Sequence, residues 1–266
     1  MAPPDPHAEI PLTGGGRTAV VRVGGVVHRE TGPWAPSVHA LLRHLENVGF
    51  ARSPRVVSSG FDDRGRETLS YLAGDFVHPR PWADGAFPAL GRMLRELHDA
   101  TRGFVPPADA QWRPWHGRDL GGADRVYGHG DTGPWNIVAR DGQPVGLIDW
   151  EVAGPVDRVV ELAQTCWLNA QLYDEDIAEK QGLPDVATRA RWVRAILDGY
   201  RLPAERRAGF VNQMIAFATR DAAQQAIDAG VTADTRDATA LWAITWRTRS
   251  AVWMDRHRAA LQDALQ

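Results

Sequence analysis

Two short segments constrain this chain more than any other part of it. They read HGDTGPWN at residues 129–136 and VGLIDW at residues 145–150. The apolar residues that follow the first segment and fill the second predict two strands, joined at Asp141-Gly142, a favourable turn pair. This hairpin would bring the loop before its first strand next to the end of its second strand.

Three side chains at this hairpin match what phosphoryl transfer requires. Mg²⁺ takes a few hard oxygen ligands beside phosphate oxygens and water, and Asn136 and Asp149 carry such oxygens. A hydroxyl that attacks a phosphate needs a carboxylate to orient it and accept its proton, a role that Asp131 fits. Taken alone, an aspartate in a loop is more often a cap, and His-x-Asp also occurs in metal hydrolases. The combination favours a kinase-like site with Asp131 as base and Asn136 and Asp149 as metal ligands.

The same residues resemble the aminoglycoside phosphotransferase-like (phosphotransferase enzyme) family, which shares the protein-kinase-like fold. The resemblance rests on HGDxxxxN and IDW, on the tail DWEVAGPVDRVVELA at residues 149–163, and on the helix predicted over 87–98. It spans about residues 12–255 and implies an ATP- and Mg-dependent phosphotransferase with an alcohol group as acceptor. The implied fold is α+β and bilobal, with a small N-terminal β-sheet lobe containing one helix and a larger, mainly helical C-terminal lobe.

Sequence patterns agree with this division. We expect a flexible terminus at 1–11, a nucleotide-binding lobe at 12–74 and a catalytic and acceptor-binding helical lobe at 75–266. In the first lobe, Thr18–Val23 and Val26–Arg29 predict a hairpin, and Ser37 is the expected cap of the following helix. The last helix is expected over about 234–264, with its tryptophans Trp242, Trp246 and Trp253 in the core.

Two segments are candidates for nucleotide binding. The run Gly14, Gly15 and Gly16 would let backbone amides approach the phosphates, although a glycine turn between strands explains it equally well. On the resemblance alone, the segment from Ser70 to Leu72 is the hinge that contacts adenine.

The resemblance also implies a strand lysine that contacts phosphates and pairs with a helix glutamate. The only lysine, Lys180, is far along the C-terminal lobe. Arg29 is the best substitute, with His28 a weaker one, because a guanidinium can bind phosphate oxygens bidentately. His39 stands near the glutamate position, so the ion pair is expected to be absent.

Several other polar residues have structural interpretations. We expect His129 to brace its loop, and Asp157 and Glu161 to brace a loop or cap a helix. Glu161 stands where the family usually has aspartate. Cys166, the single cysteine, is expected to be inert core and excludes a disulfide framework.

Composition excludes some partners. A formal charge of −3 gives no basic field for nucleic acid, and no apolar run approaches a membrane span. The first ten residues lack the features of a secretion signal, so we expect a cytoplasmic protein that binds neither nucleic acid nor membrane. No residue pattern predicts an oligomeric state.

The leading hypothesis is a small-molecule kinase, and the alternative is a catalytically weak nucleotide-binding scaffold. A protein kinase is disfavoured because the short segment after Asp149 leaves no activation loop. The nucleotide is expected to be ATP, with GTP open, and the acceptor a small alcohol or amino sugar. Aminoglycosides, choline-like alcohols and macrolides all remain open. Acidic residues would line a site for a cationic acceptor or form a solvated loop; they are Asp174, Glu175, Asp176, Asp221 and Asp228.

Overall fold

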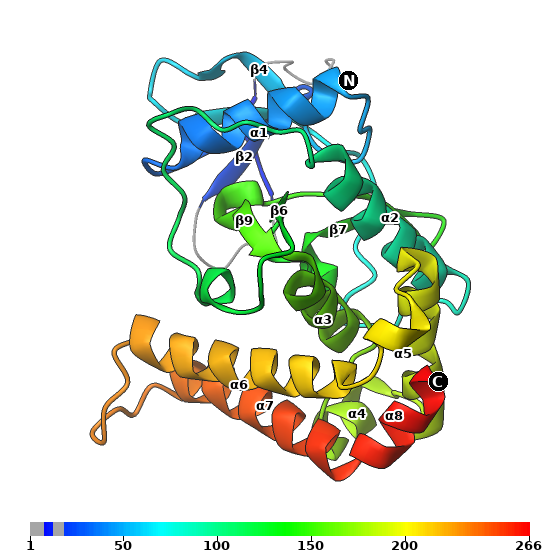
Figure 1. Ribbon diagram of the computed structural model, residues 1–266. Helices are drawn as coiled ribbons and strands as arrows, with labels where there is room; N and C mark the ends of the chain where they lie inside the picture. Colours follow the sequence, from blue (N-terminus) through cyan, green and yellow to red (C-terminus); the bar gives the residue numbers. More distant parts are fainter. Residues whose placement is uncertain (1–7, 13–18) are drawn as a thin grey trace, which may run out of the picture.

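The N-terminal part of the protein is one antiparallel sheet covered by a helix (Figure 1). The structure, a computed structural model, describes residues 8–12 and 19–266. The five strands have the order β1-β2-β3-β5-β4. Their bounds are β1 Ile10–Pro11, β2 Val20–Val23, β3 Val26–Arg29, β4 Val56–Phe61 and β5 Glu67–Ser70, and helix α1 spans Ala35–Asn47.

The β2–β3 hairpin forms as its sequence predicts. Val23 pairs with Val26 across the turn Gly24-Gly25, in which Gly24 adopts a φ of 56°, a value that favours glycine. On the far side, β3 pairs with β5 and places Arg29 directly opposite Glu67. The predicted strand residue Thr18 lies outside the described residues.

Helix α1 begins earlier than predicted. It starts at Ala35 with Pro36 in its first turn, where the fixed φ of proline suits a helix. The expected cap, Ser37, therefore lies inside the helix, and its buried Oγ accepts a hydrogen bond from the backbone N–H of Gln111 at 2.8 Å. Ser37 ties α1 to the later loop instead of starting the helix.

The C-terminal part is mainly helical (Figure 1). Its apolar stripes bury one face of each long helix in a core shared with α1 and the sheet. The helices are α2 Ala86–Ala100, α3 Arg158–Asn169, α4 Glu175–Gln181, α5 Val186–Tyr200, α6 Phe210–Asp228, α7 Ala238–Arg256 and α8 Arg258–Leu265, with short 3-10 turns at His116–Asp119 (η1), Pro134–Asn136 (η2), Trp150–Val152 (η3) and Ala204–Arg206 (η4).

The prediction of one last helix was wrong. The chain bends at His257, and α8 turns back beside α5, where Leu261 and Leu265 are buried. Burial of these leucines favours the bend although no glycine or proline marks it. Trp253 lies in the core as expected, but Trp242 is 45% exposed near the start of α7.

Two small two-stranded antiparallel sheets lie between the large sheet and the helices, and only the second of them is a hairpin. They pair β6 (Arg125–Gly128) with β9 (Gly154–Asp157), and β7 (Ile137–Arg140) with β8 (Gln143–Leu147). The segment that contains Asp131 connects β6 to β7. No helix in residues 8–12 and 19–266 has the length and apolar character needed to cross a membrane.

Candidate active site

Asp131 lies in the loop between β6 and β7. Trp135 Nε1 is 3.4 Å from its Oδ2, and no ion pair forms to it within the described residues. Burial and, secondarily, the negative charge of Asp149 raise the pKa of Asp131 to about 6. A carboxyl with this pKa is ionised at neutral pH and is more basic than an ordinary aspartate, which suits a proton acceptor.

His129 braces this loop, as predicted. Its Nε2 donates to the carbonyl of Ile148 at 2.8 Å, and its Nδ1 accepts from the N–H of Asp131 at 3.2 Å. Burial lowers the pKa of His129, so the ring is neutral. Because both ring nitrogens are engaged, His129 links the end of β6 to the segment after β8 rather than serving as a base.

The hairpin of β7 and β8 brings Asn136 next to the segment that carries Asp149. The N–H of Ile148 donates to the carbonyl of Asn136 at 2.9 Å. Asn136 Nδ2 donates to the carbonyl of Asp131 at 3.1 Å, which leaves Oδ1 without a partner among the described residues. Asp149 has a φ of 63°, and its side chain is 41% exposed. One amide oxygen and one partly exposed carboxylate fit a cation such as Mg²⁺ that is also held by phosphates.

The neighbours Arg29 and His28 point to opposite faces of β3, as strand alternation predicts. His28 Nδ1 is 3.0 Å from Asp62 Oδ2. Arg29, only 7% exposed, donates from Nε to Glu67 Oε2 at 2.5 Å and from Nη1 to Asp149 Oδ1. The guanidinium therefore lies beside the candidate metal ligand, whereas Lys180 lies on α4.

Arg29 does have an ion-pair partner, but the carboxylate comes from the sheet and not from the helix that follows β3. The partner is Glu67 on β5, and His39 of α1 bonds to the same carboxylate. Burial alone would raise the pKa of Glu67, but the bond from His39 and the charge of Arg29 outweigh it and lower that pKa. Sequence reasoning missed Glu67 because it sought the carboxylate on the helix.

Side chains of helix α3 form hydrogen bonds to the backbone of the loop that carries Asp131. Asp157 caps α3 and Glu161 braces the loop, as predicted: Glu161 accepts from the N–H of Gly130 at 2.6 Å and pairs with His98 at 2.6 Å. Gln164 Nε2 donates to the carbonyl of Gly130 at 3.0 Å, and Asn169 Nδ2 donates to that of Thr132 at 2.9 Å. The expected core residue Cys166 is buried between these positions.

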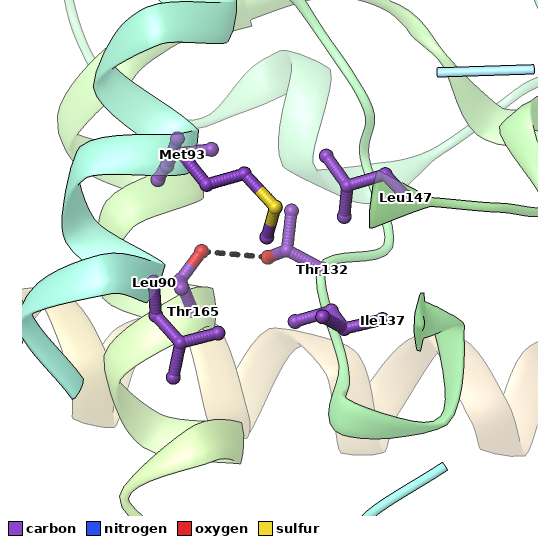
Figure 2. Close-up of a pocket in the computed structure, with 7 residues that line it drawn as sticks. Leu90, Met93, Thr132, Ile137, Leu147 and Thr165 are labelled. Carbon is purple, nitrogen blue, oxygen red and sulfur yellow. Dashed lines mark hydrogen bonds between the residues drawn. The ribbon is translucent and has the colours of Figure 1, made fainter. Parts of the chain in front are cut away.

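Sequence reasoning did not find the roles of Gln164, Thr165 and Asn169. The sequence feature that could have indicated these roles is a stripe of polar residues on α3: the three residues recur at helical spacing from Glu161, on a face of the helix that is buried. Figure 2 shows the hydrogen bond between Thr132 Oγ1 and Thr165 Oγ1, which are 2.7 Å apart, among the apolar side chains that line a space too small for a water molecule. That space is lined by Leu90, Met93, Leu94, Thr132, Ile137, Leu147 and Thr165. It packs the loop and is not a ligand site.

The candidate nucleotide segments have different outcomes. Gly14, Gly15 and Gly16 lie outside the described residues. Ser70 ends β5, and its Oγ accepts from the N–H of Arg55 at 2.8 Å, so its side chain is engaged. The backbone N–H and C=O of Leu72 bond to no other described residue.

The acidic residues proposed for a cationic acceptor are mostly neutralised. Arg249 lies 2.6 Å from Asp174 and 3.0 Å from Asp176. Glu175 pairs with Arg256, and Asp221 pairs with Arg247 at 2.5 Å; the remaining one, Asp228, accepts from Gln224. Such pairing offers little free negative charge for a polycation.

Comparison with known proteins gives one strong sequence match. Trifolitoxin immunity protein from Rhizobium leguminosarum bv. trifolii is 63% identical over 257 residues, which cover 97% of this chain and 98% of that protein. Residues 108–211 match the model of the phosphotransferase enzyme family. The matched region contains the loop of Asp131, the hairpin of Asp149 and helix α3.

Solved structures show the same fold at low identity. An amicoumacin kinase in complex with AMP-PNP and Ca²⁺ matches with a TM-score of 0.67 at 14% identity, covering 95% of this chain and 89% of its own. A microcompartment-associated aminopropanol kinase matches with a TM-score of 0.64 at 15% identity, covering 97% and 94%. The fold class predicted from the sequence is thereby confirmed.

Proposed function

The chain belongs to the phosphotransferase enzyme family, whose chemistry is phosphoryl transfer to small-molecule hydroxyl groups, and on this premise we propose a kinase that uses ATP and Mg²⁺ with Asp131 as catalytic base. The observation that carries the proposal is the environment of Asp131. Its carboxyl has no ion-pair partner within the described residues and a pKa raised to about 6, and its loop adjoins Asn136 and Asp149.

The proposed step is a displacement at phosphorus. The acceptor oxygen bonds to the γ-phosphorus, the bond from that phosphorus to the bridging oxygen breaks, and ADP leaves. Asp131 orients the hydroxyl and accepts its proton. His129 and the polar residues of α3 hold the loop, so Asp131 needs little rearrangement as the proton moves.

The cation and the nucleotide would be held from two sides. Asn136 Oδ1 and a carboxylate oxygen of Asp149 would bind Mg²⁺, which when bound offsets the charge of the phosphates. Arg29 would bind phosphate oxygens from the sheet. In this proposal residues 12–74 form the nucleotide-binding lobe and residues 75–266 form the catalytic and acceptor-binding lobe. The backbone N–H and C=O of Leu72, which bond to no other described residue, would contact the adenine ring of ATP.

The relative supports a more specific acceptor. Because this chain is 63% identical to a protein named for immunity to trifolitoxin, the proposed acceptor is a hydroxyl-bearing toxin, with trifolitoxin the first to test. The paired acidic residues of α4 and α6 disfavour a polycationic acceptor. An aminoglycoside is therefore expected to be a poorer substrate than a neutral alcohol.

A transfer screen tests the function. Purified protein, Mg²⁺ and γ-labelled ATP are incubated with trifolitoxin, aminoglycosides, other amino sugars, choline-like alcohols and macrolides. Label should move to at least one acceptor and stay in the nucleotide when Mg²⁺ is omitted. Tight ATP binding with no transfer to any acceptor favours the alternative, a catalytically weak nucleotide-binding scaffold.

A further inference from the structure

The Glu67 carboxylate joins a helix to a strand deep inside the N-terminal part. It sits on β5 directly opposite Arg29 on β3. Its Oε2 accepts from Arg29 Nε at 2.5 Å, and its Oε1 accepts from His39 Nε2 at 3.0 Å. Glu67 and His39 are each 1% exposed, so both carboxylate oxygens are engaged away from water.

This arrangement fixes the direction of the Arg29 guanidinium. The group is planar, so holding Nε from one side sets where both Nη atoms point. Nη1 contacts Asp149, on the side where phosphates are proposed to bind. A lysine has one nitrogen and could not bond to Glu67 and to a phosphate through separate atoms in this way.

Strand β4 leaves space for the His39 ring. Gly60 has a φ of 97°, and a Cβ built there would lie 2.5 Å from His39 Nδ1. The register between β4 and β5 shifts between Val56 and Phe61. The centroids of the Phe61 ring and the His39 imidazole are 4.9 Å apart. Glycine at position 60 thus allows the imidazole to reach Glu67.

We propose that Glu67 and His39 are positioning residues that hold Arg29 in the orientation that binds nucleotide phosphates. The inference rests on the proposed function, because it takes Arg29 as a phosphate ligand. The carboxylate that holds the strand cation comes from the adjacent strand, and the helix contributes a histidine that orients this carboxylate. Neither Glu67 nor His39 touches the nucleotide in this account.

Calorimetric titration of Mg·ATP into Glu67→Gln tests the role of the carboxylate. The dissociation constant should rise roughly five- to tenfold, because Arg29 loses its charged anchor. The stoichiometry should stay that of wild type, and affinity for adenosine, which lacks phosphates, should not change. The control, Glu96→Gln, makes the same chemical change in an exposed ion pair with Arg52 and should bind Mg·ATP like wild type.

A second pair of variants applies whether or not Glu67→Gln folds. His39→Leu removes the donor to Glu67 and should weaken Mg·ATP binding about two- to fivefold. His39→Gln retains a donor and should recover most of that loss. Unchanged ATP affinity in His39→Leu, or a loss of stoichiometry alone, overturns the positioning role and leaves the proposed function intact. Absence of Mg·ATP binding by wild type overturns both.

Discussion

Arg29 joins the N-terminal sheet to the segment that carries Asp149. Its guanidinium contacts Asp149 and is held by Glu67, whereas its neighbour His28 faces Asp62 on the other side of the strand. This contrast supplies a matched pair of substitutions.

Arg29→Ala should raise the dissociation constant of Mg·ATP roughly tenfold, equivalent to about 1.4 kcal/mol, because a charge-assisted phosphate contact is lost. His28→Ala should leave it unchanged. Equilibrium nucleotide titration of both variants measures this. Equal affinity of Arg29→Ala and wild type would remove Arg29 from the phosphate site.

Asp149 is the proposed metal ligand whose contribution can be measured through the Mg²⁺ dependence of nucleotide binding. Nucleotide affinity of wild type should be higher with Mg²⁺ than with EDTA, and Asp149→Ala should lose most of that difference, because its carboxylate is the only charged ligand proposed. Asp141→Asn, in the exposed turn of the same hairpin, is the control. Identical wild-type affinity in Mg²⁺ and EDTA contradicts the metal assignment.

Among the helices, α3 determines the position of the loop that carries Asp131. Its polar stripe donates to and accepts from the backbone of residues 130–132, and the apolar space beside Thr132 and Thr165 in Figure 2 is too small to admit a water molecule. The loop is therefore expected to be sensitive to changes in α3.

Gln164→Ala should destabilise the protein by about 1–3 kcal/mol, because backbone groups of Gly130 and Thr132 lose their buried partner. Transfer activity should fall more than Mg·ATP affinity. Urea denaturation and labelled transfer measure these effects, with Gln213→Ala on the exposed face of α6 as the control. Wild-type stability and activity in Gln164→Ala would show that α3 does not hold the loop.

Much of this arrangement could be predicted from local pattern. The hairpin of β7 and β8, the loop that carries Asp131 and the strand alternation at Arg29 all follow from short segments. The partnership of Arg29 with Glu67 could not, because it depends on strand register between segments distant in sequence. The bend at His257 could not either, since burial of Leu261 and Leu265, and no local breaker, produces it.

For the whole molecule, the shifted pKa values of four side chains determine how the free energy of unfolding should depend on pH. Burial lowers the pKa of His78, His116 and His129. From about pH 6.5 downward the unfolded chain binds protons at these rings before the native state does, so the free energy of unfolding should fall. Asp131 acts oppositely, because its raised pKa lets the native state bind a proton first below about pH 6. Three histidines against one aspartate leave a net loss of stability towards acid.

Urea denaturation between pH 8 and pH 5 checks this sign. The wild-type midpoint should decrease as pH falls, and Asp131→Asn should be more stable than wild type at pH 7, because it removes a half-buried charge that has no cationic partner among the described residues. Its advantage should shrink as wild-type Asp131 becomes protonated. A wild-type midpoint that rises towards pH 5 would contradict the account.

The same variant separates a catalytic role of Asp131 from a role in nucleotide binding. Wild type and Asp131→Asn are compared in two assays, transfer of labelled γ-phosphate to the best acceptor and equilibrium binding of Mg·ATP. Transfer should fall on the order of 10²- to 10⁴-fold, because the hydroxyl loses its proton acceptor, while nucleotide affinity should stay within a few-fold. Transfer by Asp131→Asn at the wild-type rate would contradict the catalytic role.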